Sequence, residues 1–157
     1  MYFQGEGVRR FDDAIPRLRF LLKRARRCFP LSSIKVLNVG IGNGWLEREC
    51  LGQGWTTCSL DPDEDAVRRV AALGADGRRG SIEEIPFGPE NFQIVFCSEV
   101  LEHLDREQLA RGISEIGRVL APGGCLIGSV PYNEDIESGK TVCPQCGLVF
   151  HRWGHHG

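Results

Sequence analysis

The stretch that most constrains this chain is a short apolar run followed by three closely spaced glycines. The run extends from Ile34 to Val39, and Gly40, Gly42 and Gly44 follow it. This order is typical of a buried strand, a tight turn and the start of a helix. Glycine has no Cβ, so the backbone here can adopt positive φ angles and let a ligand approach its N–H groups. We therefore predict a ligand-binding turn at the end of a strand.

The strand that follows narrows the class of ligand. The G-x-G-x-G spacing has Glu47 where the dinucleotide fingerprint has its last glycine, and it lacks the Lys-Ser/Thr pair of a P-loop. We predict a second strand over Thr56–Leu60, ending at Asp61. An acid about twenty residues after such a turn can accept both hydroxyls of a ribose. The glycine turn and Asp61 together indicate a cofactor that contains a nucleoside.

Strands and helices alternate along the rest of the chain. This order predicts an α/β fold of the doubly wound type, with a mostly parallel sheet and helices on both faces. The predicted helices are Phe11–Cys28, Trp45–Leu51, a segment after Pro62, and Arg106–Leu120; the other predicted strands lie within Asp76–Gly80 and at Phe92–Ser98 and Cys125–Val130.

Five motifs, in order, resemble those of class I S-adenosylmethionine (SAM)-dependent methyltransferases of the type 11, ubiquinone-pathway-like group. They are V-L-N-V-G-I-G-N-G (36–44), S-L-D-P (59–62), G-S-I-E-E-I-P-F (80–87), F-Q-I-V-F-C-S-E-V-L-E-H-L (92–104) and R-V-L-A-P-G-G-C-L-I-G-S-V-P (118–131). The resemblance implies a Rossmann-like methyltransferase core that binds SAM. It also implies two strands beyond the fifth. We find no helix and strand for them after Val130, so either the natural protein continues past Gly157 or this is a pared-down core whose sheet lacks its last two strands. The fifth strand would then be an exposed edge unless the tail, a dimer partner or another chain covers it.

The resemblance also assigns residues to the cofactor. Ser81 stands where the family often has an Asp that binds the adenine amine, and its hydroxyl can make one hydrogen bond. Ile82 fits the apolar role of packing on the adenine ring. The full predicted set of cofactor-binding residues is Gly40, Gly42, Asn43, Gly44, Asp61, Pro62, Ser81, Ile82, Cys97 and Ser98.

The motif E-x-x-E-H directly after the fourth strand holds the candidate catalytic residues, Glu99 and His103. If the chain is helical there, Glu99, Glu102 and His103 share one face and could bind a divalent cation, or His103 could act as a general base. The same motif stands in methyltransferase families that methylate a hydroxyl with the help of a metal ion. It is also common in small-molecule methyltransferases that use no metal. The alternative is that Glu99 lines the pocket and His103 is a packed, hydrogen-bonded residue.

The C-terminal tail of the chain predicts a zinc site. Cys143 and Cys146 form a C-P-x-C-G turn, and His151 with His155 (or His156) completes four ligands. Three of the four histidines of the chain gather beside its only C-x-x-C pair. A redox pair or a purification tag explains this pattern less well. Residues 132–157 are therefore predicted to be a zinc-binding tail that follows a SAM-binding core over residues 31–131.

Residues 1–5 resemble the remnant of a cleaved purification tag, and residues 6–30 form the predicted N-terminal amphipathic helix. Its cationic side chains give either a solvated face or a contact for RNA or acidic lipid.

The net charge of −2, the lack of a long apolar run and the lack of a signal peptide favour a cytoplasmic protein. We expect methyl transfer to an O or N nucleophile of a small molecule; the alternatives are metal-assisted 2′-O-methylation of RNA and a non-catalytic, zinc-stapled scaffold.

Overall fold

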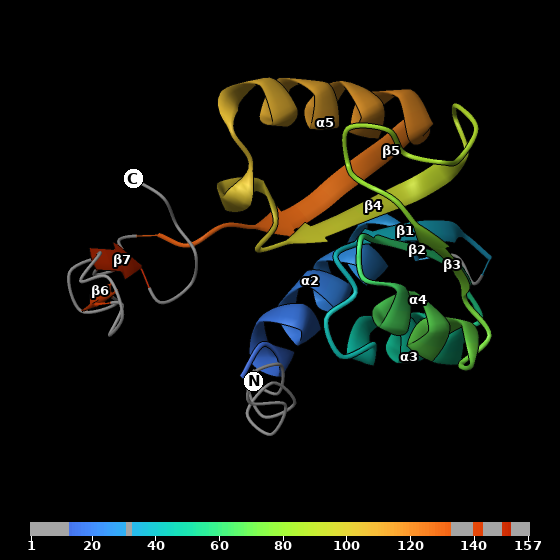
Figure 1. Cartoon of the computed structure of the whole chain (residues 1–157). Coiled ribbons are helices and arrows are strands. Elements are labelled where there is room, and N and C mark those ends of the chain that lie inside the picture. Colours follow the sequence, from blue (N-terminus) through green and yellow to red (C-terminus); the bar gives the residue numbers. More distant parts are fainter. Residues whose placement is uncertain (1–12, 31–32, 133–139, 143–148, 152–157) are drawn as a thin grey trace.

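The computed structural model describes residues 13–30, 33–132, 140–142 and 149–151. Its centre is a five-stranded parallel sheet with strand order β3-β2-β1-β4-β5 (Figure 1). The order reverses between β1 and β4, which is where open α/β sheets bind ligands. The doubly wound, Rossmann-like fold predicted from the sequence is confirmed. The strands are β1 (Lys35–Val39), β2 (Thr56–Asp61), β3 (Asp76–Arg79), β4 (Phe92–Ser98) and β5 (Leu120–Ser129).

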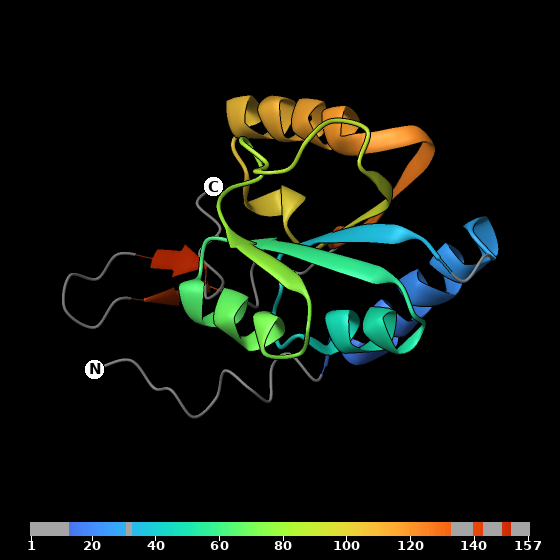
Figure 2. The ribbon, with the colours of Figure 1, turned by 90° about the vertical axis from the view of Figure 1, so that its right-hand side faces the viewer.

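The helices cover both faces of the sheet (Figures 1 and 2). On one face lie α2 (Ile15–Cys28), α3 (Trp45–Gly52) and α4 (Glu64–Ala71), and on the other lies α5 (Arg106–Val119), preceded by the 3₁₀ turn η1 (Leu101–His103). The central strands are mostly apolar because they are buried on both faces. Leu21, Leu22 and Ala25 of α2 pack with Val36 and Phe96 on one face, and Ile116 and Val119 of α5 pack with Leu37 and Val95 on the other.

Two predicted boundaries differ from the structure. Helix α2 begins at Ile15, where Pro16 occupies the first turn, because proline is tolerated there. Strand β5 begins at Leu120, earlier than the strand predicted over Cys125–Val130, and includes the A-P-G-G segment that precedes the predicted strand. Its register against β4 shifts after Phe92, and Gly123 adopts a φ of +77° in the inserted stretch. The extra residues are therefore accommodated as an irregularity within the strand.

Strand β5 is the last strand of the sheet. Beyond it, β6 (Lys140–Val142) and β7 (Val149–His151) form a separate antiparallel pair in which Val142 lies opposite Val149. In the described residues no strand pairs with the outer edge of β5. None of the helices described here is both long and apolar enough to cross a membrane.

Candidate functional site

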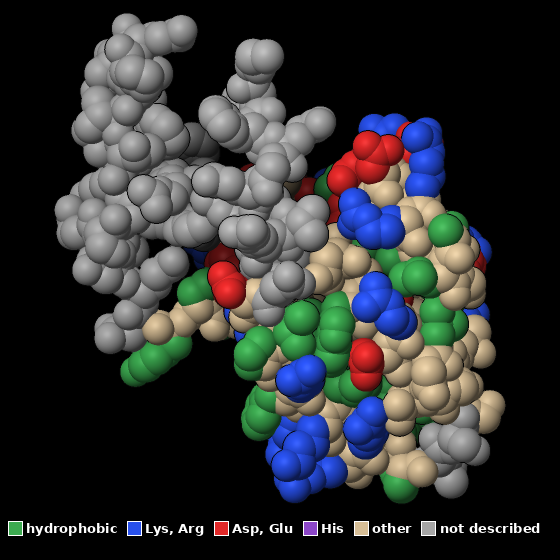
Figure 3. Space-filling view, turned by 90° about the horizontal axis from the view of Figure 1, so that it is seen from below, with side chains coloured by type: hydrophobic (Ala, Val, Ile, Leu, Met, Phe, Trp, Pro, Cys, Tyr) green, Lys and Arg blue, Asp and Glu red, His purple; other side chains and the backbone are tan. Residues whose placement is uncertain are grey.

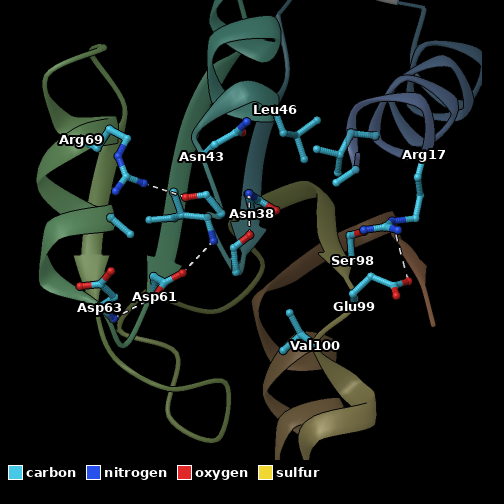
Figure 4. A pocket seen from close by; sticks show the side chains of 16 residues that line it. Arg17, Asn38, Asn43, Leu46, Asp61, Asp63, Arg69, Ser98, Glu99 and Val100 are labelled. Atoms are coloured by element: carbon cyan, nitrogen blue, oxygen red, sulfur yellow. Dashed lines mark hydrogen bonds and ion pairs between the residues drawn. The ribbon is translucent and has the colours of Figure 1, made fainter. Parts of the chain in front are cut away.

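A pocket of about 370 Å³ opens at the carboxyl ends of β1, β2 and β4, at the point where the strand order reverses (Figure 4). Asp61 and Asp63 stand at one end, and Arg17 and Glu99 at the other. Turns, strand ends and the first turns of α2 and α4 all contribute. The lining residues are Ala14, Arg17, Leu18, Asn38, Gly40, Ile41, Gly42, Asn43, Leu46, Asp61, Asp63, Ala66, Arg69, Ser98, Glu99 and Val100.

The glycine turn forms one wall of this pocket. Gly40, Gly42 and Gly44 have φ angles of +86°, +60° and +80°, a region that other residues rarely adopt. A Cβ on Gly40 would lie 2.7 Å from Cγ2 of Val100. The backbone N–H of Gly40 donates to the carbonyl of Leu60, which ties the turn to β2. The predicted role of these glycines in shaping the turn therefore agrees with the backbone.

Asp61 ends β2 with its carboxylate held by two backbone donors. Its Oδ2 accepts from the N–H of Ile41 at 2.8 Å, and its Oδ1 accepts from the N–H of Asp63 at 2.8 Å. Each oxygen keeps a further lone pair. The carboxylate is thus a fixed, two-oxygen acceptor beside the glycine turn.

A cluster of three buried polar side chains, Asn38, Glu47 and Ser59, supports the glycine turn from the core side. The Nδ2 of Asn38 donates to the carbonyl of Gly40 at 3.1 Å and to Oε1 of Glu47 at 2.7 Å, and the hydroxyl of Ser59 donates to the same Oε1 at 2.8 Å. Burial raises the pKa of Glu47, against the opposing effect of these hydrogen bonds. The group links β1, the turn, α3 and β2.

Glu99 lies at the other end of the pocket in a strained conformation, with a φ of +56°. Its carboxylate accepts from the hydroxyl of Ser129 at 3.0 Å and lies 3.8 Å from Nε of Arg17. The same Nε donates to the hydroxyl of Ser98 at 3.2 Å, which is itself hydrogen-bonded to Ser129. Helix α2, the end of β4 and the end of β5 therefore meet at Glu99.

The predicted cofactor residues divide into two sets. The pocket brings together Gly40, Gly42, Asn43, Asp61 and Ser98. The other five do not line it: Gly44 caps α3, Pro62 follows Asp61, Cys97 and Ile82 are buried in the core, and Ser81 lines a separate hollow with Arg79 and Glu115. Ile82 packs against Gly112 of α5, which explains its burial.

A shared face of Glu99, Glu102 and His103 required a helix that includes Glu99, and the structure does not have one. Only Leu101–His103 is helical, and the left-handed conformation of Glu99 turns its side chain toward Arg17 and Ser129. Nε2 of His103 lies 3.9 Å from a Glu102 carboxylate oxygen. Within the described part of the chain, no three His, Cys, Asp or Glu side chains come close enough to hold a metal ion.

The tail ligands lie outside the described residues, apart from the backbone of His151 in β7; Cys143, Cys146, His155 and His156 are among those not described.

The sequence analysis did not predict several residues of the pocket. Four of them line it, and the fifth, Ser129, supports Glu99; the four are Arg17, Asn38, Asp63 and Arg69. Asn38 carried a signal, because it is a polar residue with apolar neighbours on both sides within the predicted strand. Arg17 carried none, since 81 residues separate it from Ser98.

Comparison with protein families decides the class of this domain. Residues 37–128, more than half of the chain, match the family model described as a methyltransferase domain. The chain belongs to this methyltransferase family. The matched span begins in β1 and ends in β5, so it includes part or all of each of the five strands and the pocket residues except those contributed by α2 and the residue before it.

Curated relatives include quinone-pathway enzymes. The chain is 34% identical over 116 residues to the ubiquinone biosynthesis O-methyltransferase of Thiobacillus denitrificans, covering 69% of this chain and 47% of that protein. It is 28% identical over 142 residues to the enzyme of the same name from Azorhizobium caulinodans, covering 82% and 55%. The chain thus spans about half the length of these relatives.

Solved structures share the fold. The SAM-dependent methyltransferase of Mesorhizobium loti superposes with a TM-score of 0.60 at 23% identity, covering 74% of this chain and 53% of that one. A SAM-dependent methyltransferase from Methanosarcina mazei gives a TM-score of 0.63 at 18% identity, covering 77% and 73%. At these identities the likeness concerns the fold alone.

Proposed function

We propose that this chain binds SAM in the pocket at the switch point and transfers its methyl group to an oxygen or nitrogen nucleophile of a small molecule. The observation that carries the proposal is the Asp61 carboxylate, whose two oxygens are aligned by the N–H groups of Ile41 and Asp63 beside the glycine turn. Two adjacent acceptor oxygens match the two adjacent hydroxyls of a ribose. When bound, SAM supplies a methyl group on an activated sulfonium.

The other end of the pocket suits the amino-acid part of the same cofactor. Arg17 offers a cation for a carboxylate, and its side chain is held by Ser98 and faces Glu99. The glycine turn lets a ligand lie close to the backbone, since no Cβ projects from Gly40 or Gly42. The described residues therefore fit a ligand with a ribose at one end and charged groups at the other.

In this proposal Glu99 accepts the proton that the attacking hydroxyl or amine loses as its new bond to the methyl carbon forms and the carbon–sulfur bond breaks. Glu99 lines the pocket, whereas His103 does not and is half-exposed. Of the two predicted catalytic residues, Glu99 is thus the stronger candidate. A Glu99→Gln variant retains an acceptor for Ser129, so it should keep cofactor affinity and lose turnover.

Calorimetric titration with SAM and with its demethylated product tests the binding step. The parent chain should bind both, and Asp61→Ala should stay folded while its affinity falls by about tenfold or more. Equal affinity in Asp61→Ala would refute the assignment of this pocket. Absence of binding in a folded parent would instead favour a non-catalytic scaffold.

A second candidate acceptor, the 2′-hydroxyl of RNA, is favoured by one observation. Helix α2 carries six cations and no acid, and Phe20 lies 61% exposed among its outward cations. Figure 3 shows Lys and Arg side chains interspersed with hydrophobic ones on this face of the molecule. The apolar side of α2 is already buried in the core. The guanidinium groups of its arginines suit RNA phosphates, and the exposed ring of Phe20 suits stacking with a base. The first turn of α2 reaches the pocket through Arg17.

Fluorescence anisotropy with a labelled single-stranded RNA tests this candidate. Binding should weaken with salt and should fall in a variant with Lys23→Ala and Arg27→Ala on α2. Matched changes at Arg106 and Arg111 on α5 provide the control. Equal losses in the two variants, or no binding by the parent, would rule out α2 as an RNA contact and leave the small-molecule acceptor.

We also propose that Cys143, Cys146, His151 and His155 (or His156) hold a structural zinc ion. The support is the ligand spacing and the antiparallel pairing of β6 with β7, which brings Val142 opposite Val149 at the two ends of the segment that contains both cysteines. Metal analysis of the purified chain should find about one equivalent of zinc, released by a chelator. Less than a tenth of an equivalent after purification without chelators would exclude the site.

A further inference from the structure

Two cysteines that are far apart in the sequence face each other between helix α2 and strand β5. In α2, Leu21 and Ala25 are buried against the sheet, and Cys28 follows them at helical spacing on the same stripe. In β5, Cys125 and Ile127 are two residues apart and pack into the same apolar cluster as α2. The stripe of the helix and the face of the strand therefore bring the two thiols together.

The two thiols are in contact, and they differ in how far solvent reaches them. Helix α2 packs on β5, and the Cys125 thiol is hydrogen-bonded to the Cys28 side chain. Both are free thiols, Cys28 exposed and Cys125 half-buried. The other cysteines in the described part of the chain, Cys50, Cys58 and Cys97, are buried. A dissolved oxidant therefore reaches Cys28 first and finds a second thiol beside it.

We propose that Cys28 and Cys125 form a reversible disulfide that ties the end of α2 to β5 when hydrogen peroxide is present. The Cys28 thiolate attacks one peroxide oxygen and the O–O bond breaks, which leaves a sulfenic acid and a hydroxide that becomes water. The Cys125 sulfur then attacks the Cys28 sulfur, so the S–S bond forms, the S–O bond breaks and a second water leaves. Two thiols and one peroxide thus give one disulfide and two waters.

The order of these steps follows from the surroundings of the two thiols. Burial raises the pKa of the Cys125 thiol, and the neighbouring Cys28 raises it further. A protonated, shielded thiol is a poor first target for peroxide. It needs only to attack a sulfur with which it is already in contact. Cys28 is therefore the thiol that is oxidised and Cys125 the one that resolves it.

The disulfide would act on the helix that forms one wall of the pocket. Arg17 and Leu18 of α2 line the pocket, and Cys28 is the last residue of the same helix. A bond from Cys28 to Cys125 closes a loop of about 100 residues, which restricts the unfolded chain strongly. It also opposes local separation of α2 from the sheet. This tether does not depend on which cofactor the pocket binds.

Peptide mapping tests the pairing. The purified chain is reduced, treated with hydrogen peroxide at pH 8, blocked with an alkylating reagent and digested with trypsin without reduction. Cys28 then lies in the peptide 28–35 and Cys125 in the peptide 119–140, and each contains one cysteine. Mass spectrometry should find these two peptides joined, two hydrogens lighter than their sum, and a thiol reductant should separate them.

Thermal unfolding and hydrogen exchange test the tether. The oxidised parent should have a Tm about 5–15 °C above that of the reduced parent, and the amides of α2 should exchange more slowly. Cys28→Ser is the control, because an exposed position tolerates the change. Its Tm should not rise on oxidation.

Several results would overturn the proposal. Joining of Cys28 to a different cysteine, or its oxidation to a sulfinic acid without any joined peptide, refutes the pairing. Joined peptides with an unchanged Tm and unchanged exchange in α2 refute the tether. An equal rise in Tm on oxidation of Cys28→Ser shows that another pair of thiols is responsible.

Discussion

Arg118 of α5 ties the loop between β3 and β4 to that helix, and replacing it gives a prediction that separates stability from binding. Its guanidinium donates twice to Glu115 at 2.7 Å, once to the carbonyl of Phe87 at 2.9 Å and once to that of Ile85 at 2.9 Å. Glu115 also accepts from the N–H of Ile85 at 2.8 Å. An Arg118→Met variant keeps the aliphatic stem and removes all four donated bonds.

The expected loss of stability follows from the carbonyls of Ile85 and Phe87, which lose their hydrogen-bond donor in Arg118→Met. Hydrogen bonds from a charged donor contribute about 1.5–3 kcal/mol each when buried. The Arg118 side chain is 37% exposed, so water replaces part of this, and we expect a loss of about 2–3 kcal/mol in the free energy of unfolding. For a chain of this length that corresponds to a fall of about 4–12 °C in Tm.

Thermal and urea unfolding at several pH values provide the assay. The hydrogen bonds from Arg118 lower the pKa of Glu115 below its ordinary value of 4.5. A lowered folded-state pKa stabilises the fold above the unfolded-state pKa, and this contribution disappears as the pH falls through the folded-state value. The difference between the parent and Arg118→Met should therefore narrow below pH 4.5.

Arg106→Met, an exposed change on the same helix, is the control and should alter stability by about 0.5 kcal/mol or less. A loss in Arg118→Met no larger than this would refute the reasoning. Affinity for S-adenosylhomocysteine should stay unchanged, because Ser81 and Ile82 do not line the pocket. A tenfold loss of affinity in folded Arg118→Met would show that this loop contacts the cofactor after all.

One further substitution tests the pocket wall, and one labelling experiment tests the core. Gly40→Ala should lower both Tm and cofactor affinity, because the residue has a φ of +86° and the new Cβ would meet Val100 at 2.7 Å; an unaffected titration would contradict the geometry of the turn. Alkylation mapped by mass spectrometry at pH 8 should modify exposed Cys28 and spare Cys97, because burial raises the pKa of the Cys97 thiol to about 12; equal labelling of a folded sample would show that the core opens there.

The sequence was a sound guide where local patterns and topology act together. The apolar run over Phe92–Ser98 matches β4 residue for residue, and Asp61 lies beside the glycine turn because neighbouring parallel strands end at the same edge. The packing of Ile82 against α5 could not be predicted from the sequence, for a physical reason. An isoleucine that packs on a ring and one that packs on a helix look alike in sequence, and the gap left by Gly112 on α5 is visible only in the fold.

Glu99 and the support of the turn show what sequence reasoning cannot reach. The residue type of Glu99 gives no sign of its positive φ, so the sequence could not show that Glu99 lies outside the helical turn that contains Glu102 and His103. The link from Asn38 to Glu47 depends on which way an amide faces in a packed interior. Such partners are chosen by three-dimensional contact and not by spacing along the chain.

The central claim is that Asp61 holds the ribose of SAM at the switch point, and a ligand change matched to a side-chain change tests it most directly. The measurement is the affinity of the parent and of Asp61→Ala for S-adenosylhomocysteine and for its 2′-deoxy analogue. The parent should prefer the intact ribose by about tenfold or more, and the variant should show no preference. A preference that survives in a folded Asp61→Ala would contradict the account.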